Sequence, residues 1–141
     1  MTTGVASAVK CRFSTDARFS GRGRQCCAGH RGRVAAGKIV TIETRPSFIK
    51  SIGGPSLVPQ PWPIARDLID GAIAVSPAEV TEAMRLLFSK AKIVAEGAGA
   101  CLAAAAIARP DLTGKIVCGI SGGNIDAAAY SVVLAGGIPA A

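Results

Sequence analysis

The sequence has few aromatic residues and no long hydrophobic run. Only 4% of its 141 residues are aromatic: four phenylalanines, one tyrosine and one tryptophan. The arginines therefore have no aromatic platform beside them on which bases could stack, which counts against a nucleic-acid-binding protein. The longest apolar runs, Ala98–Ala108 and Ala127–Ala141, are shorter than the ~20 residues that a membrane helix needs, so we expect no membrane partner.

The sequence also lacks a regular cysteine framework and a plausible metal site. An odd number of cysteines, five, without regular spacing argues against a set of disulfides, and no signal peptide is evident. Cys101 and Cys118 lie in apolar stretches, where we expect small buried hydrophobic side chains. Cys26 and Cys27 are adjacent, and His30 is the only histidine, so no metal ligand set is predicted. These features favour a cytoplasmic protein in a reducing environment.

The basic charge belongs to one segment. Residues 1–38 hold eight of the sixteen lysines and arginines and a single acidic residue, whereas residues 39–141 are balanced. We predict that residues 1–33 form a basic, irregular or disordered segment. It could be an arm that contacts phosphates, a transit peptide, or non-native sequence from a shifted reading frame, and we favour the last.

The remaining sequence alternates between expected strands and helices, which predicts an α/β fold. Ser76, Pro77 and Glu79 form a strong helix start, with a cap, a proline in the first turn and a capping box. The expected strands are Lys38–Thr44, Ala72–Val75 and Lys115–Ile120, and the expected helices are Trp62–Asp70, a helix that begins at Pro77, Gly97–Ala108 and Asp126–Leu134.

The organising stretch is the apolar run Ile116–Ile120, which we predict to be a buried strand. It delivers Ser121 into a turn that contains Gly122 and Gly123, the usual geometry of a site at the carboxyl end of a strand. On spacing alone, an ordinary strand-to-helix turn without a site is the commoner explanation of a serine followed by two glycines. Glu96, which opens the helix of small residues, could be a second site feature or a solvated residue near a helix N-terminus.

Four motifs in this order resemble the threonine/serine dehydratases, also called threonine ammonia-lyases, to which serine racemase is closely related. These are pyridoxal-phosphate enzymes of the type II, tryptophan-synthase β-like fold. The resemblance implies a partial three-layer sandwich over residues 34–141, the C-terminal part of the large catalytic domain, with residues 1–33 outside it. The motifs are Trp62-Pro63-Ile64 with Arg66–Asp70, then Val75-Ser76, Glu96-Gly97-Ala98-Gly99-Ala100 and Ser121-Gly122-Gly123-Asn124-Ile125-Asp126.

The resemblance implies where the cofactor, pyridoxal 5'-phosphate, would lie. In the family, the serine that corresponds to Ser121 hydrogen-bonds the pyridine nitrogen. A neutral hydroxyl leaves that nitrogen largely unprotonated, which suits elimination of water from a β-hydroxy amino acid. The residues that the resemblance places at the cofactor are Ser121, Gly122, Gly123, Asn124, Glu96, Gly97 and Gly99.

The departures from the family are equally informative. No lysine stands in a Ser-x-Lys-type motif for the Schiff base, so no catalytic residue is assigned, and the glycine-rich phosphate loop is missing. Phe48–Ser51 stands where the family commonly has Ala-Asp-Gly or Val-Asp-Gly. We expect a dehydratase fragment that is inactive alone. The sequence leaves open whether this fragment binds pyridoxal phosphate. Its partners would be further copies of itself or a complementary part of the domain; the alternative is a non-catalytic, small-molecule-binding or self-associating module.

Overall fold

A computed structural model describes residues 22–23, 38–39, 41, 46–52, 56, 59–60, 62–64 and 73–141. The expected strand Lys38–Thr44 and the expected helix Trp62–Asp70 lie largely outside these residues, although Trp62–Ile64 are helical. Cys26, Cys27 and His30 are outside them altogether. In chain order the elements are β1 (Arg22–Gly23), the 3₁₀ turn η1 (Lys50–Ile52), β2 (Ala74–Val75), α4 (Pro77–Leu86), the π-helical turn η2 (Leu87–Ala91), α5 (Gly97–Ile107) and α6 (Ala127–Leu134).

Helix α4 begins as the sequence predicted. The Ser76 hydroxyl accepts a hydrogen bond from the Glu79 amide, and the Glu79 carboxylate accepts one from the Ser76 amide, so the capping box is complete. One face of the helix is turned to the interior, because Val80, Ala83 and Met84 are fully buried. The chain then continues through η2 and leaves it at Lys92, which has a positive φ of 59°.

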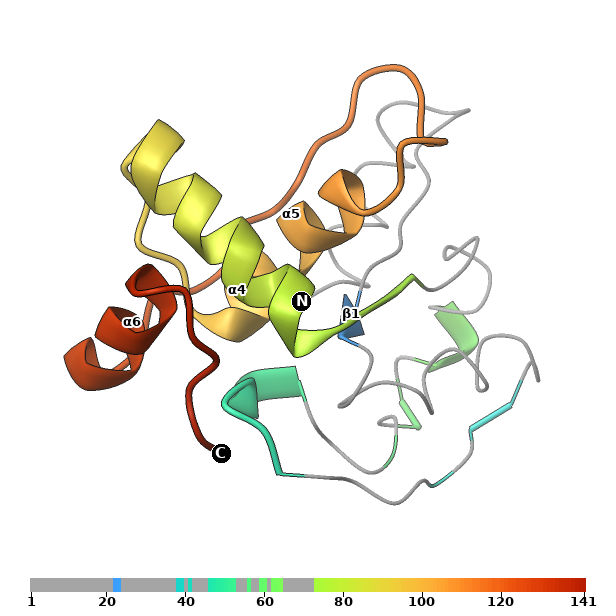
Figure 1. Ribbon diagram of the computed structural model, residues 1–141. Coiled ribbons are helices and arrows are strands. Elements are labelled where there is room, and N and C mark those ends of the chain that lie inside the picture. Colours follow the sequence, from blue (N-terminus) through green and yellow to red (C-terminus); the bar gives the residue numbers. More distant parts are fainter. Residues whose placement is uncertain are drawn as a thin grey trace.

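The hydrophobic core lies mainly between helices α4 and α5, and α6 packs against α4 (Figure 1). Helix α5 consists mostly of alanine and glycine, so its backbone can lie close to its neighbours, and its buried residues occupy several faces. Helix α6 begins after Asp126 and ends before Gly136, whose φ of 92° suits glycine. The sequence thus predicted α5 and α6 to within one residue at each end.

The sheet in the described part of the chain consists of two short parallel strands, β1 and β2, in which Arg22 pairs with Ala74 and Gly23 pairs with Val75. Val75 is fully buried and belongs to the core. The regular elements among the described residues are therefore mostly helices. Of the three-layer sandwich that the resemblance implies, they contain this parallel pair, helix α5, which contacts both strands, and helix α4, which packs on α5.

The prediction of a buried strand over Lys115–Ile120 is wrong. The segment is not a strand, and Val117 is 93% exposed. It keeps part of a strand's alternation: Cys118 contacts the carbonyl of Leu102 on α5, and Ile120 packs on the core, whereas Val117 faces outward. A buried strand requires hydrogen-bonded neighbours and a second covering layer, and the described residues supply neither to this segment.

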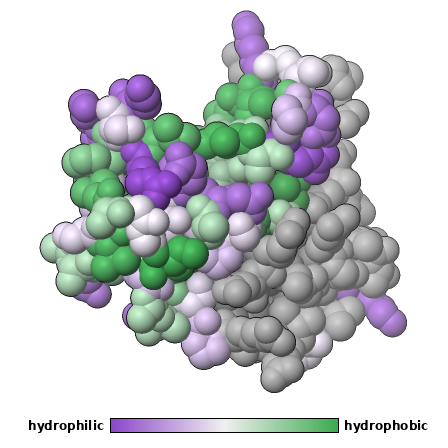
Figure 2. Space-filling model, in the orientation of Figure 1, coloured by the Kyte–Doolittle hydropathy of each residue, from purple (hydrophilic) through white to green (hydrophobic). Residues whose placement is uncertain are grey.

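Apolar and polar side chains alternate over the face that the helices form, where green patches lie beside purple ones (Figure 2). Within the described ranges, no helix has both the length and the apolar character needed to cross a bilayer.

Candidate active site

The two motifs that the sequence singled out, around Glu96 and around Ser121, meet in the structure. The amide of Glu96 donates a hydrogen bond of 2.9 Å to the carbonyl of Gly122, although 26 positions separate them in the chain. The Glu96 carboxylate lies against the α-carbon of Gly122, so closely that a methyl group there would overlap it. Glu96 is therefore held by its backbone at the turn that follows Ser121, and its side chain covers that turn.

Glycines make this close approach possible. A β-carbon at position 99 would lie 2.6 Å from the Gly122 carbonyl oxygen, and one at position 123 would lie 2.8 Å from the Val94 carbonyl oxygen. Real β-carbons do not occupy such positions. The turn after Ser121 can therefore approach the first turn of α5 only with glycine at position 99, and Val94, before α5, only with glycine at position 123. The glycines thus shape a contact between two backbone segments.

Ser121 is exposed, and among the described residues its hydroxyl has no hydrogen-bond partner. Asn124 is also exposed, at the centre of the turn that the Ile125 amide closes by donating to the Gly123 carbonyl. The structure therefore brings Glu96, Gly99, Gly122 and Gly123 into one cluster, with the Ser121 hydroxyl available to a ligand at its edge.

Gly97 has different neighbours from the other predicted site residues. A β-carbon there would lie 2.8 Å from Cε2 of Phe48 and 3.0 Å from Cγ1 of Ile49. Phe48 is thus a neighbour of the site helix that the predicted motifs did not include. The signal was present, because an aromatic residue stood in a place where the family commonly has Ala-Asp-Gly or Val-Asp-Gly.

The thiol of Cys118, on the segment that leads to Ser121, donates a hydrogen bond of 3.6 Å to the carbonyl of Leu102. Partial burial raises the pKa of this thiol above its ordinary value, so the neutral form is favoured. Cys101, on α5, is fully buried, and its thiol donates to the Gly97 carbonyl. Cys101 is therefore the buried packing group that its apolar surroundings predicted, whereas Cys118 is only partly buried.

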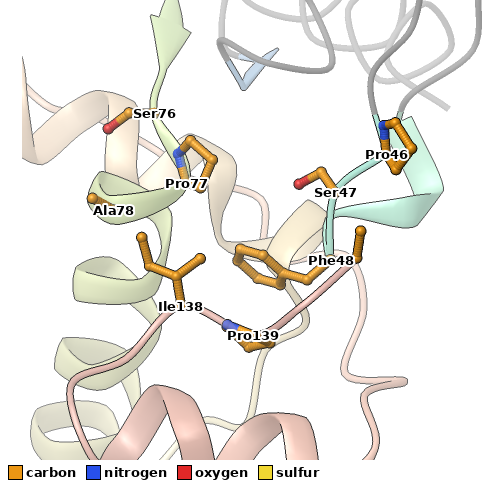
Figure 3. A pocket seen from close by; sticks show the side chains of 9 residues that line it. Pro46, Ser47, Phe48, Ser76, Pro77, Ala78, Ile138 and Pro139 are labelled. Atoms are coloured by element: carbon orange, nitrogen blue, oxygen red, sulfur yellow. The ribbon is translucent and has the colours of Figure 1, made fainter.

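A pocket of about 290 Å³ lies outside the cluster around Glu96 and Ser121 (Figure 3). Its walls come from three segments: residues 46–48, the start of α4, and the chain after α6. The hydroxyl of Ser47 points toward the space between these segments, as do the side chains of Phe48 and Ile138. The pocket shares no residue with the Glu96–Ser121 cluster. The lining residues are Pro46, Ser47, Phe48, Ser76, Pro77, Ala78, Ile138, Pro139 and Ala141.

Comparison with known proteins decides the family. The model of the family described as "Pyridoxal-phosphate dependent enzyme" matches residues 1–122, most of the chain. The chain belongs to this family. The match includes residues 1–33, which the sequence assigned to an irregular segment outside the fold; that boundary stays a prediction.

Among the relatives of this pyridoxal-phosphate-dependent chain is the L-threonine ammonia-lyase of Geobacter sulfurreducens, 39% identical over 107 residues that cover 74% of this chain and 27% of the relative. The serine racemase of Oryza sativa is 31% identical over 99 residues, or 65% of this chain and 29% of the relative. The crystal structure of a threonine deaminase from T.th. matches with a TM-score of 0.76 and 30% identity, covering 89% of this chain and 46% of that one. The chain thus spans about a quarter of its curated relatives and less than half of that solved structure.

The residues present fit one end of the family's cofactor. A free serine hydroxyl next to two glycines suits the ring nitrogen of pyridoxal phosphate, because the hydroxyl can donate to it and no β-carbon follows directly. The described cluster contains no cation for the phosphate group and no lysine beside Ser121. It therefore fits the pyridine-nitrogen end of the cofactor and leaves the phosphate end to other residues.

Proposed function

We propose that this chain supplies the pyridine-nitrogen side of a pyridoxal-phosphate site of the threonine/serine dehydratase type. The observation that supports the proposal is the hydrogen bond from the Glu96 amide to the Gly122 carbonyl, because it joins the two family motifs at the exposed Ser121 hydroxyl. The complete site would release ammonia and a 2-oxo acid from L-threonine or L-serine.

Ser121 would orient the ring by donating a hydrogen bond from its hydroxyl to the pyridine nitrogen. Pyridoxal phosphate, when bound, supplies an electron sink for breaking the Cα–H bond of an amino acid. Because a hydroxyl does not protonate the ring nitrogen as a carboxylic acid would, less charge collects in the ring. This arrangement favours prompt loss of a β-hydroxyl group, the step that distinguishes a dehydratase.

The glycine cluster and Glu96 would keep the hydroxyl of Ser121 in place. Gly99 and Gly122 allow the first turn of α5 to approach the turn after Ser121, and Glu96 ties the two together through its backbone. A site held by backbone contacts loses little entropy when the ligand arrives, which is the benefit of preorganisation.

The 141-residue chain alone would be catalytically inactive. None of its lysines stands in a Ser-x-Lys-type motif, and it has no glycine-rich phosphate loop. Elimination needs a group that forms the covalent link to the cofactor and exchanges protons with the substrate, and other polypeptide would have to provide it.

Titration of the chain with pyridoxal phosphate, followed by absorbance and by isothermal calorimetry, tests the contact with Ser121. We expect weak binding that Ser121→Ala reduces several-fold, because one hydrogen bond contributes about 0.5–1.5 kcal/mol. Ser131→Ala, an exposed serine on α6, is the matched control and should leave the affinity unchanged. Equal affinities for the unmodified chain and Ser121→Ala would refute the proposed contact.

Borohydride reduction and peptide mass spectrometry test the missing lysine separately. We expect sparse labelling spread over exposed lysines and no 2-oxo acid formed from L-threonine or L-serine. Stoichiometric labelling of a single lysine, or measurable turnover, would show that the chain is a complete catalyst and that our view of it as incomplete is wrong.

A further inference from the structure

The pocket between residues 46–48, the start of α4 and the chain after α6 has no part in the proposed cofactor contact, because it shares no residue with the Glu96–Ser121 cluster (Figure 3). Its volume is about 290 Å³. An apolar cavity of about 150 Å³ inside a protein can hold benzene. The pocket therefore admits a molecule larger than benzene, such as an aromatic ring with a short side chain.

The walls of the pocket are apolar and stiff. Pro46, Pro77 and Pro139 contribute three proline rings, which lose no rotamer freedom when a ligand arrives. The ring of Phe48 and the side chain of Ile138 face the space between these prolines (Figure 3). Phe48 can offer a bound aromatic ring the offset or edge-on contact that aromatic pairs prefer.

Helix α5 holds the Phe48 ring from its other side. A β-carbon at position 97 would lie 2.8 Å from Cε2 of Phe48, so only glycine leaves room for the ring there. Phe48 also packs against the hydrophobic core. The ring is therefore a supported wall of the pocket, which keeps it from swinging inward to fill the space.

One hydrogen-bond donor points into the pocket. The Ser47 hydroxyl faces the space between the walls (Figure 3) and accepts a hydrogen bond of 3.3 Å from the Ile49 amide. Among the described residues this hydroxyl donates to no acceptor. Its proton is therefore available to an oxygen atom of a ligand.

The charges around the pocket select against an ion. None of the described residues that line it is charged. The positive end of α4 is already offset by the Glu79 carboxylate, which accepts a hydrogen bond from the Ser76 amide. A charged ligand would lose its hydration here without gaining a counter-ion.

We propose that this pocket binds a small, uncharged aromatic molecule that carries one hydrogen-bond-accepting oxygen. The volume sets the size of the molecule, Phe48 and the prolines favour its aromatic ring, and Ser47 binds its oxygen. The proposal does not rest on cofactor binding.

Titration of the full chain with 4-phenylbutan-2-one, followed by amide NMR signals, tests the proposal. This neutral ketone has an aromatic ring and one carbonyl oxygen. We expect a dissociation constant of about 1 mM, with shifted signals for Ser47, Phe48 and Ala78, and for Gly97 because the Phe48 ring lies against it. The matched charged probe is 3-phenylpropanoate, in which a carboxylate replaces the methyl ketone; it should bind at least about tenfold more weakly.

Three variants locate the contact. Ile138→Ala shortens an apolar wall and should weaken binding of the ketone about three- to tenfold. Ile138 is 52% exposed, so this change leaves the core intact. Ile107→Ala, at a 54% exposed position on α5 outside the pocket, is the matched control and should bind as the unmodified chain does. Ser47→Ala removes the donor and should weaken binding about two- to tenfold.

Several results would overturn the proposal. They are no binding of the ketone up to its solubility limit, equal binding of the carboxylate, equal affinities for the two isoleucine variants, and an unchanged affinity for Ser47→Ala. Shifts of the same size at Ile93, Val94 and Val117 would also contradict it. These exposed apolar residues lie outside the pocket, so such shifts would mean that the ketone adheres to apolar surface in general.

Discussion

Helix α4 and the segment Lys115–Ile120 both carry large apolar side chains, yet these side chains reach opposite states in the same molecule. In α4, Val80, Ala83 and Met84 are fully buried between α5 and α6, and the helix satisfies its own backbone hydrogen bonds. In the segment, Val117 is almost fully exposed and the backbone is unpaired among the described residues. The difference shows that a helix forms its own backbone hydrogen bonds and needs neighbours only for its apolar face. A buried strand also needs other strands that pair with its backbone along its edges.

Replacing Met84 by alanine should have the largest effect on stability and would sharpen this contrast. Met84 is fully buried in the core beneath α4, so Met84→Ala should lower the free energy of unfolding by about 2–5 kcal/mol. Val117→Ala, in the exposed segment, should change it by less than about 0.5 kcal/mol. Urea denaturation followed by circular dichroism measures both. Comparable losses for the two variants would mean that the segment is packed in solution and that the contrast is false.

The same contrast explains what the sequence could predict. The start of α4 was predictable because Ser76, Pro77 and Glu79 are neighbours whose hydrogen bonds close within one turn. The meeting of Glu96 with the turn after Ser121 was predicted only through the family resemblance, because no local signal connects positions so far apart. The state of Lys115–Ile120 was not predictable from its own residues, since burial of a strand depends on layers contributed by other parts of the fold.

Gly99→Ala tests whether the turn after Ser121, which directly follows the exposed segment Lys115–Ile120, is held in place by its contact with α5. The new β-carbon would lie 2.6 Å from the Gly122 carbonyl oxygen, and a backbone group cannot move aside cheaply. Such overpacking costs about 1–3 kcal/mol, partly offset by the ~1 kcal/mol advantage of alanine in a helix. We expect a net loss of up to about 2 kcal/mol, together with shifted NMR signals for the Glu96 and Gly122 amides.

Gly119→Ala is the matched control, because its β-carbon would meet only the Leu102 side chain, at 3.9 Å. It should leave stability within about 0.5 kcal/mol of the unmodified chain. If the two glycine variants behaved alike, the turn after Ser121 would be as loosely held as the residues before it.

Removing the cap of α4 tests how much of its order is local. Ser76→Ala deletes the acceptor for the Glu79 amide and should lower the free energy of unfolding by about 0.5–2 kcal/mol. Ser76→Asp keeps an acceptor and should retain most of the stability, and Ser89→Ala, an exposed serine in η2, is the control. Thermal denaturation compares the three. A cap that contributes nothing would mean that tertiary packing alone defines where the helix begins.

Changing Tyr130 should have the smallest effect on stability, and its ionisation reports on the packed region between α6 and η2 alone. Its ring meets Phe88 of η2 edge-on, with the centroids 5.8 Å apart, and among the described residues its buried hydroxyl has no hydrogen-bond partner. Burial raises the pKa of Tyr130 above the ordinary value of about 10. Because the folded state then holds the proton more tightly than the unfolded state, this contribution to stability is fully present below pH ~10. It is lost as the pH rises through the folded-state pKa.

Tyr130 is the only tyrosine, so its ionisation can be followed by ultraviolet absorbance without interference from another residue. We expect it to ionise at a higher pH than a free tyrosine does. Tyr130→Phe keeps the ring contact with Phe88 and should remove the alkaline loss of stability that this group causes. At neutral pH the variant should be as stable as the unmodified chain or up to about 1 kcal/mol more stable, since a buried hydroxyl without a partner is removed. Ionisation at the ordinary pKa would show that water reaches this hydroxyl, and that the contact between α6 and η2 is as open as Lys115–Ile120.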